Sequence, residues 1–357
     1  MKHKCIPFVI VLFILTTITS CIIDIPKEII IDTNPFNNLD NEGNTQLEQG
    51  SELIILIPDI QRYTNHPQNH PILESIINRT IEINQLRFKV KAVVQVGDVT
   101  DTNTPYEWEI AQKIFSKLGK EKIPYILTTG NHDYGDLGTL NSRQTYFNDF
   151  FDFSSQSSFK QCYLAKYYEN SLFEIELQGQ PLQIITLEFG PSKAIIDWAD
   201  KILDKDKNSL LVTHAYLFKD KERYNWSQFG NSQNISPYSY TLLYKSLEDG
   251  EIDVNDGEDI WQKLIYPSKN IRFIMCGHKT KPDYVGNLIS ENIEKKDVLQ
   301  MLFNTQDFPN GGDGWIQILE FKNDKKTVEV KTYSSLYNKW NTGSGLQYQF
   351  IYNANEY

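Results

Sequence analysis

The sequence of 357 residues predicts an α/β protein in which two β-sheets pack face to face and helices lie outside them. Three observations lead to this prediction. From Glu52 onward, short apolar runs typical of buried strands alternate with segments of helical periodicity. After Gln161 the alternation changes to adjacent strand-like runs and a hairpin signal. Hydrophobic residues make up 40% of the chain, which is enough for one large core.

The first half of the folded region is expected to alternate between strand and helix. Residues 53–57 form a continuous apolar run, as in a central strand that is buried on both faces. Apolar residues recur at helical spacing in 73–81 and 106–118, whereas 90–96 and 123–128 resemble strands. Parallel strands joined by helical crossovers follow from this order.

The second half is expected to be richer in strands. Two of them flank Gln178 and Gly179, with the spacing of a β-hairpin. The expected strands are residues 172–177, 182–187, 209–212, 271–275, 298–303, 315–321 and 328–332, and the expected helices are 194–203 and 259–266. The sequence shows neither an internal repeat nor a linker after Gly50, so a single domain, residues 51–357, is expected.

The first 50 residues are expected to be a targeting segment and a tether. Residues 1–20 have two lysines before an apolar stretch that is too short to span a membrane comfortably. The stretch ends in Ile-Thr-Ser-Cys21, which resembles the lipobox of bacterial lipoproteins and implies cleavage before Cys21 and lipid attachment to its sulfur. An ordinary secretory signal and an uncleaved anchor are the alternatives. Residues 21–50 are expected to form a flexible tether, because polar residues dominate from Asn34 to Gly50 and apolar periodicity is weak.

The lipobox resemblance implies an exported protein that is anchored to a bacterial membrane, on the periplasmic or the cell-surface side. Cys5 would leave with the signal, so only Cys162 and Cys276 remain and a disulfide framework is excluded. These two could pair in an oxidising compartment, although Cys276 lies in an apolar run and is expected to be a buried free thiol. The net charge of −11 argues against general binding to nucleic-acid backbones, which requires a basic face.

Metal-binding side chains follow five of the expected strands. The segments are DIQ at 59–61, GDVTD at 97–101, GNHD at 130–133, THA at 213–215 and GHK at 277–279. Because side chains just past the strand ends project from one edge of a sheet, we expect them to converge there. Carboxylate, amide and imidazole groups together suit Mn, Fe or Zn better than Ca. The sequence therefore predicts a site for divalent metal ions.

The ordered motifs resemble those of the calcineurin-like metallophosphoesterase superfamily. Its blocks are Asp-x-His, Gly-Asp-x-x-Asp, Gly-Asn-His-Asp/Glu, an isolated His and Gly-His-x-His, and four of the five match between Asp59 and His278. The phrases PDIQ, LEFGP, DGEDIW, CGH and NGGDGW resemble a bacterial branch in which Gln replaces the first histidine. The resemblance implies an α/β fold, a four-layer αββα sandwich of two mixed β-sheets flanked by helices. It also implies hydrolysis of a phosphate mono- or diester by metal-activated water.

The resemblance assigns most of the motif residues to two divalent ions. Asp98 would bridge both ions. Asp59 would bind the first ion, with the carbonyl oxygen of Gln61 beside it. The second ion would be completed by Asn131, His214 and His278.

Two further residues would act on the substrate. By resemblance, His132 would hydrogen-bond the substrate phosphate or protonate the leaving oxygen. Asp101 would hold the imidazole of His132 in place and raise its pKa.

The first ion's site departs from the superfamily pattern. Gln61 stands where a histidine is usual, and Thr280 stands where the last histidine of Gly-His-x-His would be. With both imidazoles missing, we expect a weaker and harder site. Three outcomes are open: Mg or Mn bound loosely, another side chain in place of a lost histidine, or an enzyme that uses mainly one tightly bound ion.

Several other residues could contribute to the site. His66 and His70 are candidates to replace a lost histidine, although their Asn-His-Pro settings are typical of a loop before a helix. Residues that could line the site, each with ordinary packing, solvation or a tight turn as the alternative, are Lys279, Tyr63, Tyr134, Trp315 and Asp313.

Both the substrate class and catalysis itself have alternatives. A monoester needs positive contacts for its dianion, and a diester needs fewer. Thr102 follows Asp101, where the protein phosphatases have an arginine, which weakens the case for a phosphoprotein substrate. The rival function is a non-catalytic or weakly catalytic surface binding module with a degraded first metal site. A third possibility is a tether or adhesin in which one metal is structural. His132 and Asp101 argue against both, because holding an ion requires neither.

Overall fold

The computed structural model describes residues 47–86, 88–243 and 253–352, all within one compact unit, Phe36–Tyr357. The predicted signal peptide, the predicted lipid site at Cys21 and the tether up to residue 46 lie outside the described residues. Leu47 is buried, and the backbone N–H of Glu48 donates to the carboxylate of Glu320. The folded unit therefore begins before residue 51, within the segment assigned to the tether.

Among the described helices, none combines the length and apolar character needed to cross a bilayer.

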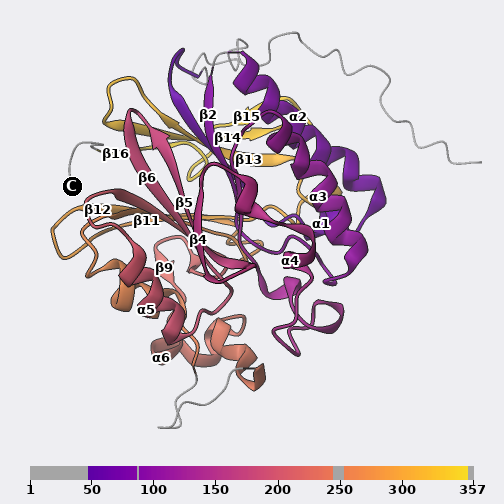
Figure 1. The fold of residues 1–357 in the computed structure, drawn as a ribbon, viewed down its shortest axis with the longest axis vertical. Coiled ribbons are helices and arrows are strands. Elements are labelled where there is room, and N and C mark those ends of the chain that lie inside the picture. The colour runs from indigo at the N-terminus through magenta and orange to yellow at the C-terminus, as the bar shows by residue number, and fades with distance from the viewer. Residues whose placement is uncertain (1–46, 87, 244–252, 353–357) are drawn as a thin grey trace, which may run out of the picture. The chain divides into compact units, whose positions relative to one another are not determined.

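Two mixed sheets of seven strands each form the centre of the fold (Figure 1). The strands of the first sheet are β1 (Glu52–Ile57), β2 (Lys89–Gln95), β3 (Tyr125–Leu127), β13 (Trp315–Phe321), β14 (Thr327–Ser334), β15 (Lys339–Asn341) and β16 (Tyr348–Ile351). Those of the second are β4 (Phe159–Leu164), β5 (Tyr167–Leu177), β6 (Gln180–Leu187), β7 (Asn208–Thr213), β10 (Ile271–Cys276), β11 (Val285–Glu291) and β12 (Asp297–Phe303). Strands β8 (Leu217–Lys219) and β9 (Glu222–Arg223) form a separate small ribbon.

The middle of each sheet is parallel. The first sheet has the order β15-β14-β13-β1-β2-β3, with β16 also paired to β14, and β1, β2 and β3 are parallel. The second has the order β11-β12-β10-β7-β6-β5-β4, with β12, β10, β7 and β6 parallel. Parallel neighbours end at the same edge, so each sheet presents a row of carboxyl ends, where ligands collect in α/β folds.

Helices cover the outer faces of both sheets. In Figure 1, α2 (His70–Gln85) and α3 (Pro105–Lys120) lie together on one side and α5 (Lys193–Ile202) lies on the other. The remaining helices are short: α1 (Gln61–Thr64), α4 (Phe147–Phe150), α6 (Trp226–Phe229) and α7 (Gly257–Ile260), which continues into a π-helical turn, η7 (Trp261–Ile265). The 3-10 turns are η1 (Pro67–Asn69), η2 (Asn131–Asp133), η3 (Asp136–Gly138), η4 (Phe153–Ser155), η5 (Gly230–Gln233), η6 (Pro237–Leu243) and η8 (Pro309–Gly311).

Strand β7 shows how the core is divided into layers. Leu210 and Val212 belong to the large apolar cluster that also contains residues of the first sheet, α2 and α3. Leu211, on the opposite face, packs in a second cluster with residues of α5 and η7. This alternation is expected of a strand whose two faces are both buried. The order helix, sheet, sheet, helix confirms the predicted four-layer αββα sandwich.

The buried side chain of Glu107 connects the fold to the predicted site. Its carboxylate accepts the backbone N–H groups of Asp101 at 3.1 Å, Thr102 at 3.1 Å and Thr104 at 3.2 Å. Thr104 and Glu107 form a capping box at the start of α3, which stabilises a helix terminus by satisfying its free N–H groups. The same carboxylate therefore holds both the helix start and the loop that carries Asp101.

We predict that Glu107→Ala lowers the free energy of unfolding by about 1–3 kcal/mol, because it leaves buried N–H groups without acceptors. Urea denaturation of the purified protein measures this change. Glu109→Ala is the matched control, since Glu109 lies on the same helix but is exposed. Equal, small effects of both substitutions would contradict the role given to Glu107.

Candidate metal centre

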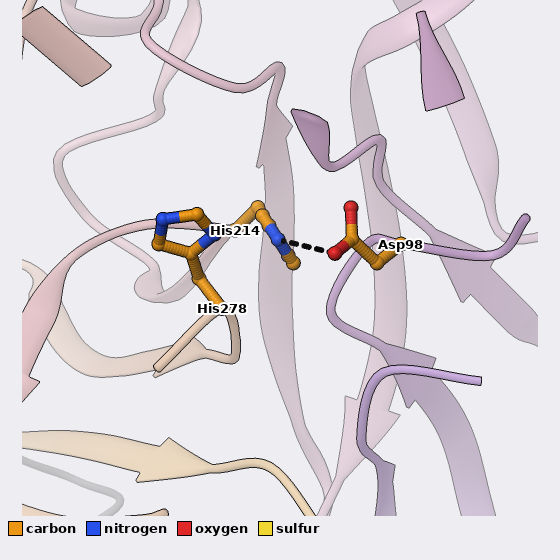
Figure 2. A group of neighbouring side chains, drawn as sticks. All are labelled: Asp98, His214 and His278. Carbon is orange, nitrogen blue, oxygen red and sulfur yellow. Dashed lines mark ion pairs between the residues drawn. The ribbon is translucent and has the colours of Figure 1, made fainter. Parts of the chain in front are cut away.

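The predicted metal-binding residues lie just past the carboxyl ends of strands from both sheets. Asp59, Asp98 and Asn131 follow β1, β2 and β3 of the first sheet, and His214 and His278 follow β7 and β10 of the second. The ligand atoms of Asp98, His214 and His278 all lie within 4.8 Å of one another. Figure 2 shows the imidazole of His214 between the other two side chains. The two sheets thus contribute opposite sides of one buried cluster.

His214 is completely buried and its ring is fixed by a bond across the two sheets. Its Nδ1 donates to the carbonyl of Val96 at 2.8 Å. Its Nε2 then lies 3.3 Å from Oδ2 of Asp98 and 4.0 Å from Oδ2 of Asp59. Against the effect of burial, these two carboxylates raise the pKa of His214 to about 9. An ion bound here would compete with the proton for the Nε2 lone pair, since a ligating histidine must be neutral.

His278 offers the cluster its other ring nitrogen. Its Nε2 donates to the carbonyl of Ile235 at 2.7 Å, which leaves Nδ1 as the nitrogen that can bind an ion. Burial, with the charge of His214 adding to it, lowers the pKa of His278 to about 3. The backbone N–H of His278, in the left-handed region at φ 71°, donates to Oδ2 of Asp59 at 3.1 Å. His278 therefore stays neutral and also helps to hold Asp59.

The two carboxylates of the first sheet are buried side chains held by protein donors. Oδ1 of Asp98 accepts the backbone N–H of His132 at 2.9 Å, and its Oδ2 accepts Nε2 of Gln61 at 2.9 Å. Oδ2 of Asp59 accepts Nδ2 of Asn304 at 2.7 Å. Burial raises the pKa of Asp59 well above its ordinary value, whereas His214 and His132 outweigh burial and lower the pKa of Asp98. Both groups would be stabilised as anions by a cation nearby.

Three buried ligand atoms of the site have no hydrogen-bond partner among the described residues. They are Oε1 of Gln61, Oδ1 of Asn131 and Nε2 of His214, the last of which forms an ion pair with Asp98 at 3.3 Å but no hydrogen bond. Leaving a buried polar atom without a partner costs about 1–3 kcal/mol, so each such atom calls for an explanation. All three atoms are among the ligands predicted from the sequence. Amide oxygen, imidazole and carboxylate suit divalent ions, so the residues present fit the metal centre that the sequence predicts.

His132 lies at the more accessible rim of the cluster, with 37% of its side chain exposed. Its Nδ1 donates to the backbone carbonyl of Asp101 at 2.9 Å, and the Asp101 carboxylate is farther away, at 3.7 Å. That carboxylate also accepts Nδ2 of Asn65 at 2.6 Å and lies 3.5 Å from the guanidinium of Arg62. Against burial, the charge of Asp98 and the contacts with Asp101 raise the pKa of His132. With Nδ1 bound to the Asp101 carbonyl, Nε2 is the other ring nitrogen of this partly exposed side chain.

Asp133 joins the two loops that carry Asp98 and Asn131. Its carboxylate accepts the backbone N–H groups of Val99 at 3.1 Å, Thr100 at 2.8 Å and Gly130 at 2.8 Å. Asp133 is the last residue of the GNHD motif, but the sequence analysis predicted no role for it. Asn304 and Arg62 were missed as well. Asn304 follows an expected strand, 298–303, so the signal used for the other site residues would have found it.

The structure gives the other candidate residues ordinary contacts. Among the described residues, neither His66 nor His70 belongs to the cluster of groups able to hold an ion, and Nε2 of His70 contacts the carbonyl of Thr64 at 3.0 Å. The remaining candidates make the following contacts: Tyr63 accepts the N–H of Gly314, Tyr134 bonds Thr129, Asp313 accepts from Tyr337, Lys279 lies over the ring of Phe218, and Trp315 packs near Tyr337. Cys162 and Cys276 are both free, and Cys276 is buried as expected.

Comparison with known proteins places these residues in a wider context. The family model described as calcineurin-like phosphoesterase matches residues 53–282. The uncharacterized protein YvnB of Bacillus subtilis (strain 168) is 26% identical over 291 residues, which cover 78% of this chain and 20% of that protein. The chain thus spans about a fifth of the length of this curated relative.

Two solved structures are also similar over most of the chain. The purple acid phosphatase PPD1 from yellow lupin (Lupinus luteus) is 11% identical, with a TM-score of 0.46, over 85% of this chain and 54% of that one. The 5'-nucleotidase from Candida albicans SC5314 is 12% identical, with a TM-score of 0.38, over 87% of this chain and 53% of that one.

We predict that Gly277→Ala displaces Asp59 and weakens ion binding by at least about tenfold, because a misplaced ligand or supporting group typically costs 10–100-fold in affinity. A Cβ at position 277 would lie 1.9 Å from Oδ1 of Asp59 and 2.9 Å from the side chain of Val96. Metal content after dialysis against a fixed Mn²⁺ concentration measures the effect. Gly119→Ala is the control, because its Cβ would meet only Tyr125, at 3.5 Å. Unchanged metal content in Gly277→Ala would contradict the close packing around Asp59.

Proposed function

Because the chain belongs to the calcineurin-like phosphoesterase family, we propose that it hydrolyses a phosphate mono- or diester with the help of divalent metal ions. The observation that carries this proposal is the buried set of Asp98, His214 and His278, whose ligand atoms lie within 4.8 Å of one another. The unpartnered oxygens of Gln61 and Asn131 support the same assignment.

The proposed ligands form two half-sites that share Asp98. The second half-site, Asp98, Asn131, His214 and His278, would hold the second ion, of Mn, Fe or Zn. The first half-site, Asp59 and Gln61 with the shared Asp98, would hold the first ion more weakly, and Mg or Mn suits this oxygen-rich set. When bound, the ions would lower the pKa of a water molecule toward neutrality and take up negative charge that develops on the phosphoryl group.

The chain's own residues would orient the substrate and supply the proton. His132, at the rim, would hydrogen-bond the phosphate or protonate the leaving oxygen through Nε2, and the Asp101 carbonyl orients its ring. Arg62 adds a second positive charge near this rim, since its guanidinium lies 3.5 Å from the Asp101 carboxylate and 44% of its side chain is exposed. A cation at this place favours a monoester dianion over a diester.

The cellular setting is part of the proposal. The lipobox-like Ile-Thr-Ser-Cys21 supports export and attachment to a bacterial membrane through a lipid on Cys21, on the periplasmic or the cell-surface side. The rival function remains a surface binding module that keeps ions without turnover. The position of His132, accessible and close to the buried cluster, favours the enzyme, because a module that only binds ions has no need of a proton donor there.

We expect the purified protein to hydrolyse p-nitrophenyl phosphate, and more slowly its bis ester, when Mn²⁺, Mg²⁺ or Zn²⁺ is added and to stop when a chelator is added. Asp98→Asn should lose both bound metal and turnover, because Asp98 lies in both half-sites. Asp206→Asn, an exposed residue in a surface ion pair, is the control and should behave as wild type. If no ion supports turnover of either ester, and Asp98→Asn binds as much metal as wild type, the two-ion enzyme is wrong and the binding module is favoured.

We expect His132→Ala to reduce turnover by about 10²–10⁴, the usual contribution of a general acid, while metal content stays close to that of wild type. Steady-state kinetics and metal analysis of the same preparation provide the two measurements. His70→Ala serves as the control, because His70 contacts the carbonyl of Thr64 and lies outside the ion-binding cluster. Loss of metal together with activity in His132→Ala would instead identify His132 as a ligand.

A further inference from the structure

Asn304 is a buried amide that contacts the first half-site. It follows β12 directly and is 1% exposed. Its Nδ2 donates to Oδ2 of Asp59 at 2.7 Å, and its Oδ1 accepts the backbone N–H of Gln306 at 3.0 Å. Its own backbone N–H donates to the carbonyl of Tyr284 at 2.7 Å. Both ends of the side chain and the backbone are therefore engaged.

The contact with Gln306 determines which end of the amide faces Asp59. Only the carbonyl oxygen of an asparagine side chain can accept an N–H, so Oδ1 must face Gln306. The amide nitrogen then faces Asp59 as a donor. Because an amide nitrogen has no lone pair available for an ion, Asn304 is not an ion ligand in this orientation. Its contribution to the site is to hold the carboxylate of Asp59.

Asp59 has a special place among the proposed ligands of the first ion. Asp98 is shared with the second ion, and Gln61 is neutral and already donates its Nε2 to Asp98. Asp59 is thus the one negatively charged ligand that the first half-site does not share. The orientation of its carboxylate is set by Asn304 and by the backbone N–H of His278 at 3.1 Å. Gly277 lies so close to Asp59 that any side chain at position 277 would clash with it.

We infer that Asn304 is a positioning residue for the first ion, which acts by orienting Asp59. This inference rests on the proposed function, because it assumes that the first half-site binds an ion. Groups that orient ligands typically contribute 10–100-fold to metal affinity. The second half-site has separate supports, since His214 is held by Val96 and His278 by Ile235. Loss of Asn304 therefore weakens the first ion selectively.

The most informative substitution is Asn304→Ser, because it removes the contact with Asp59 alone. A serine hydroxyl can still accept the N–H two residues later, as in a turn, but it is too short to reach Asp59. Asn304→Ala removes both contacts. Comparing the two variants separates the contact with Asp59 from the contact with Gln306, and Asn304→Ser remains informative if Asn304→Ala fails to fold.

Asn292 offers a matched control at the other end of the same strand pair. It is also 1% exposed, donates Nδ2 to the carbonyl of Ser268 at 2.9 Å and accepts backbone N–H groups through Oδ1. Asn292→Ala therefore removes an equally buried amide without touching the metal centre.

The experiment is a Mn²⁺ titration of the purified protein by calorimetry, with wild type and the three variants. We expect two binding events in wild type. In Asn304→Ser and Asn304→Ala, the Kd of the weaker event should rise by about 10–100-fold, while that of the tighter event changes by less than about twofold. Asn292→Ala should leave both Kd values unchanged. In hydrolysis assays, the Asn304 variants should require proportionally more Mn²⁺ to reach their full turnover.

Three results would overturn the inference: one binding event in wild type, an unchanged weaker Kd in Asn304→Ser, or equal weakening of both events. A defect in Asn304→Ala that Asn304→Ser does not share would assign the residue to the Gln306 turn instead. Failure of the proposed function gives a different result. In that case wild type hydrolyses neither ester with any ion, whatever the titrations show for Asn304.

Discussion

The structure of this protein depends on the burial of two carboxylates where its two sheets meet. Asp59 and Asp98 have 0% and 2% of their surface exposed, and among the described residues neither forms an ion pair with a lysine or an arginine. Burying such charges is costly unless they are paired and hydrogen-bonded. Here the partners are backbone N–H groups, two amides and the imidazole of His214. Among these partners only His214 can carry a charge, so a cation bound here would take the place of its proton and stabilise both carboxylates as anions.

The surrounding backbone is shaped to bring these groups together. Asp98 and His278 both adopt φ values in the left-handed region, 50° and 71°, which are uncommon for residues other than glycine and cluster at functional sites. Gly130 and Gly277 allow the backbone to approach Asp98 and Asp59 so closely that a Cβ would lie 2.2 and 1.9 Å from their oxygens. The motifs therefore need their glycines for space as much as their acids and histidines for chemistry.

Most of the fold could be predicted from the sequence because its central strands are strongly apolar. Residues 53–57, 209–212 and 271–275 each matched an observed strand, since strands buried on both faces leave a clear pattern. Strands β4, β11, β15 and β16, at or near sheet edges, were missed. Half-exposed strands at sheet edges alternate polar and apolar residues weakly, and β4 also has irregular register. The predicted helix at 259–266 is α7 followed by a π-helical turn, a distinction that periodicity does not reveal.

Only those site residues that follow strand ends or belong to the motifs could be predicted from the sequence. The strand ends and motifs identified Asp98, His214 and His278, which the structure brings together, but long-range contacts such as that of Arg62 with Asp101 depend on how α1 packs. The likeness to a known family supplied roles for these residues that spacing alone does not give. The identity of the atom that holds the His132 ring, a backbone carbonyl, carries no sequence signal at all.

The bond between His214 and Val96 has a consequence for the stability of the whole protein. It connects a residue after β7 in the second sheet to the end of β2 in the first, and the proposed ligands continue the same connection between the sheets. An ion held by Asp98 and His214 would bridge the sandwich much as a covalent cross-link does. A ligand that binds only the folded state stabilises it by mass action. Metal supply would then govern not only turnover but also how long each molecule stays folded and resists proteolysis.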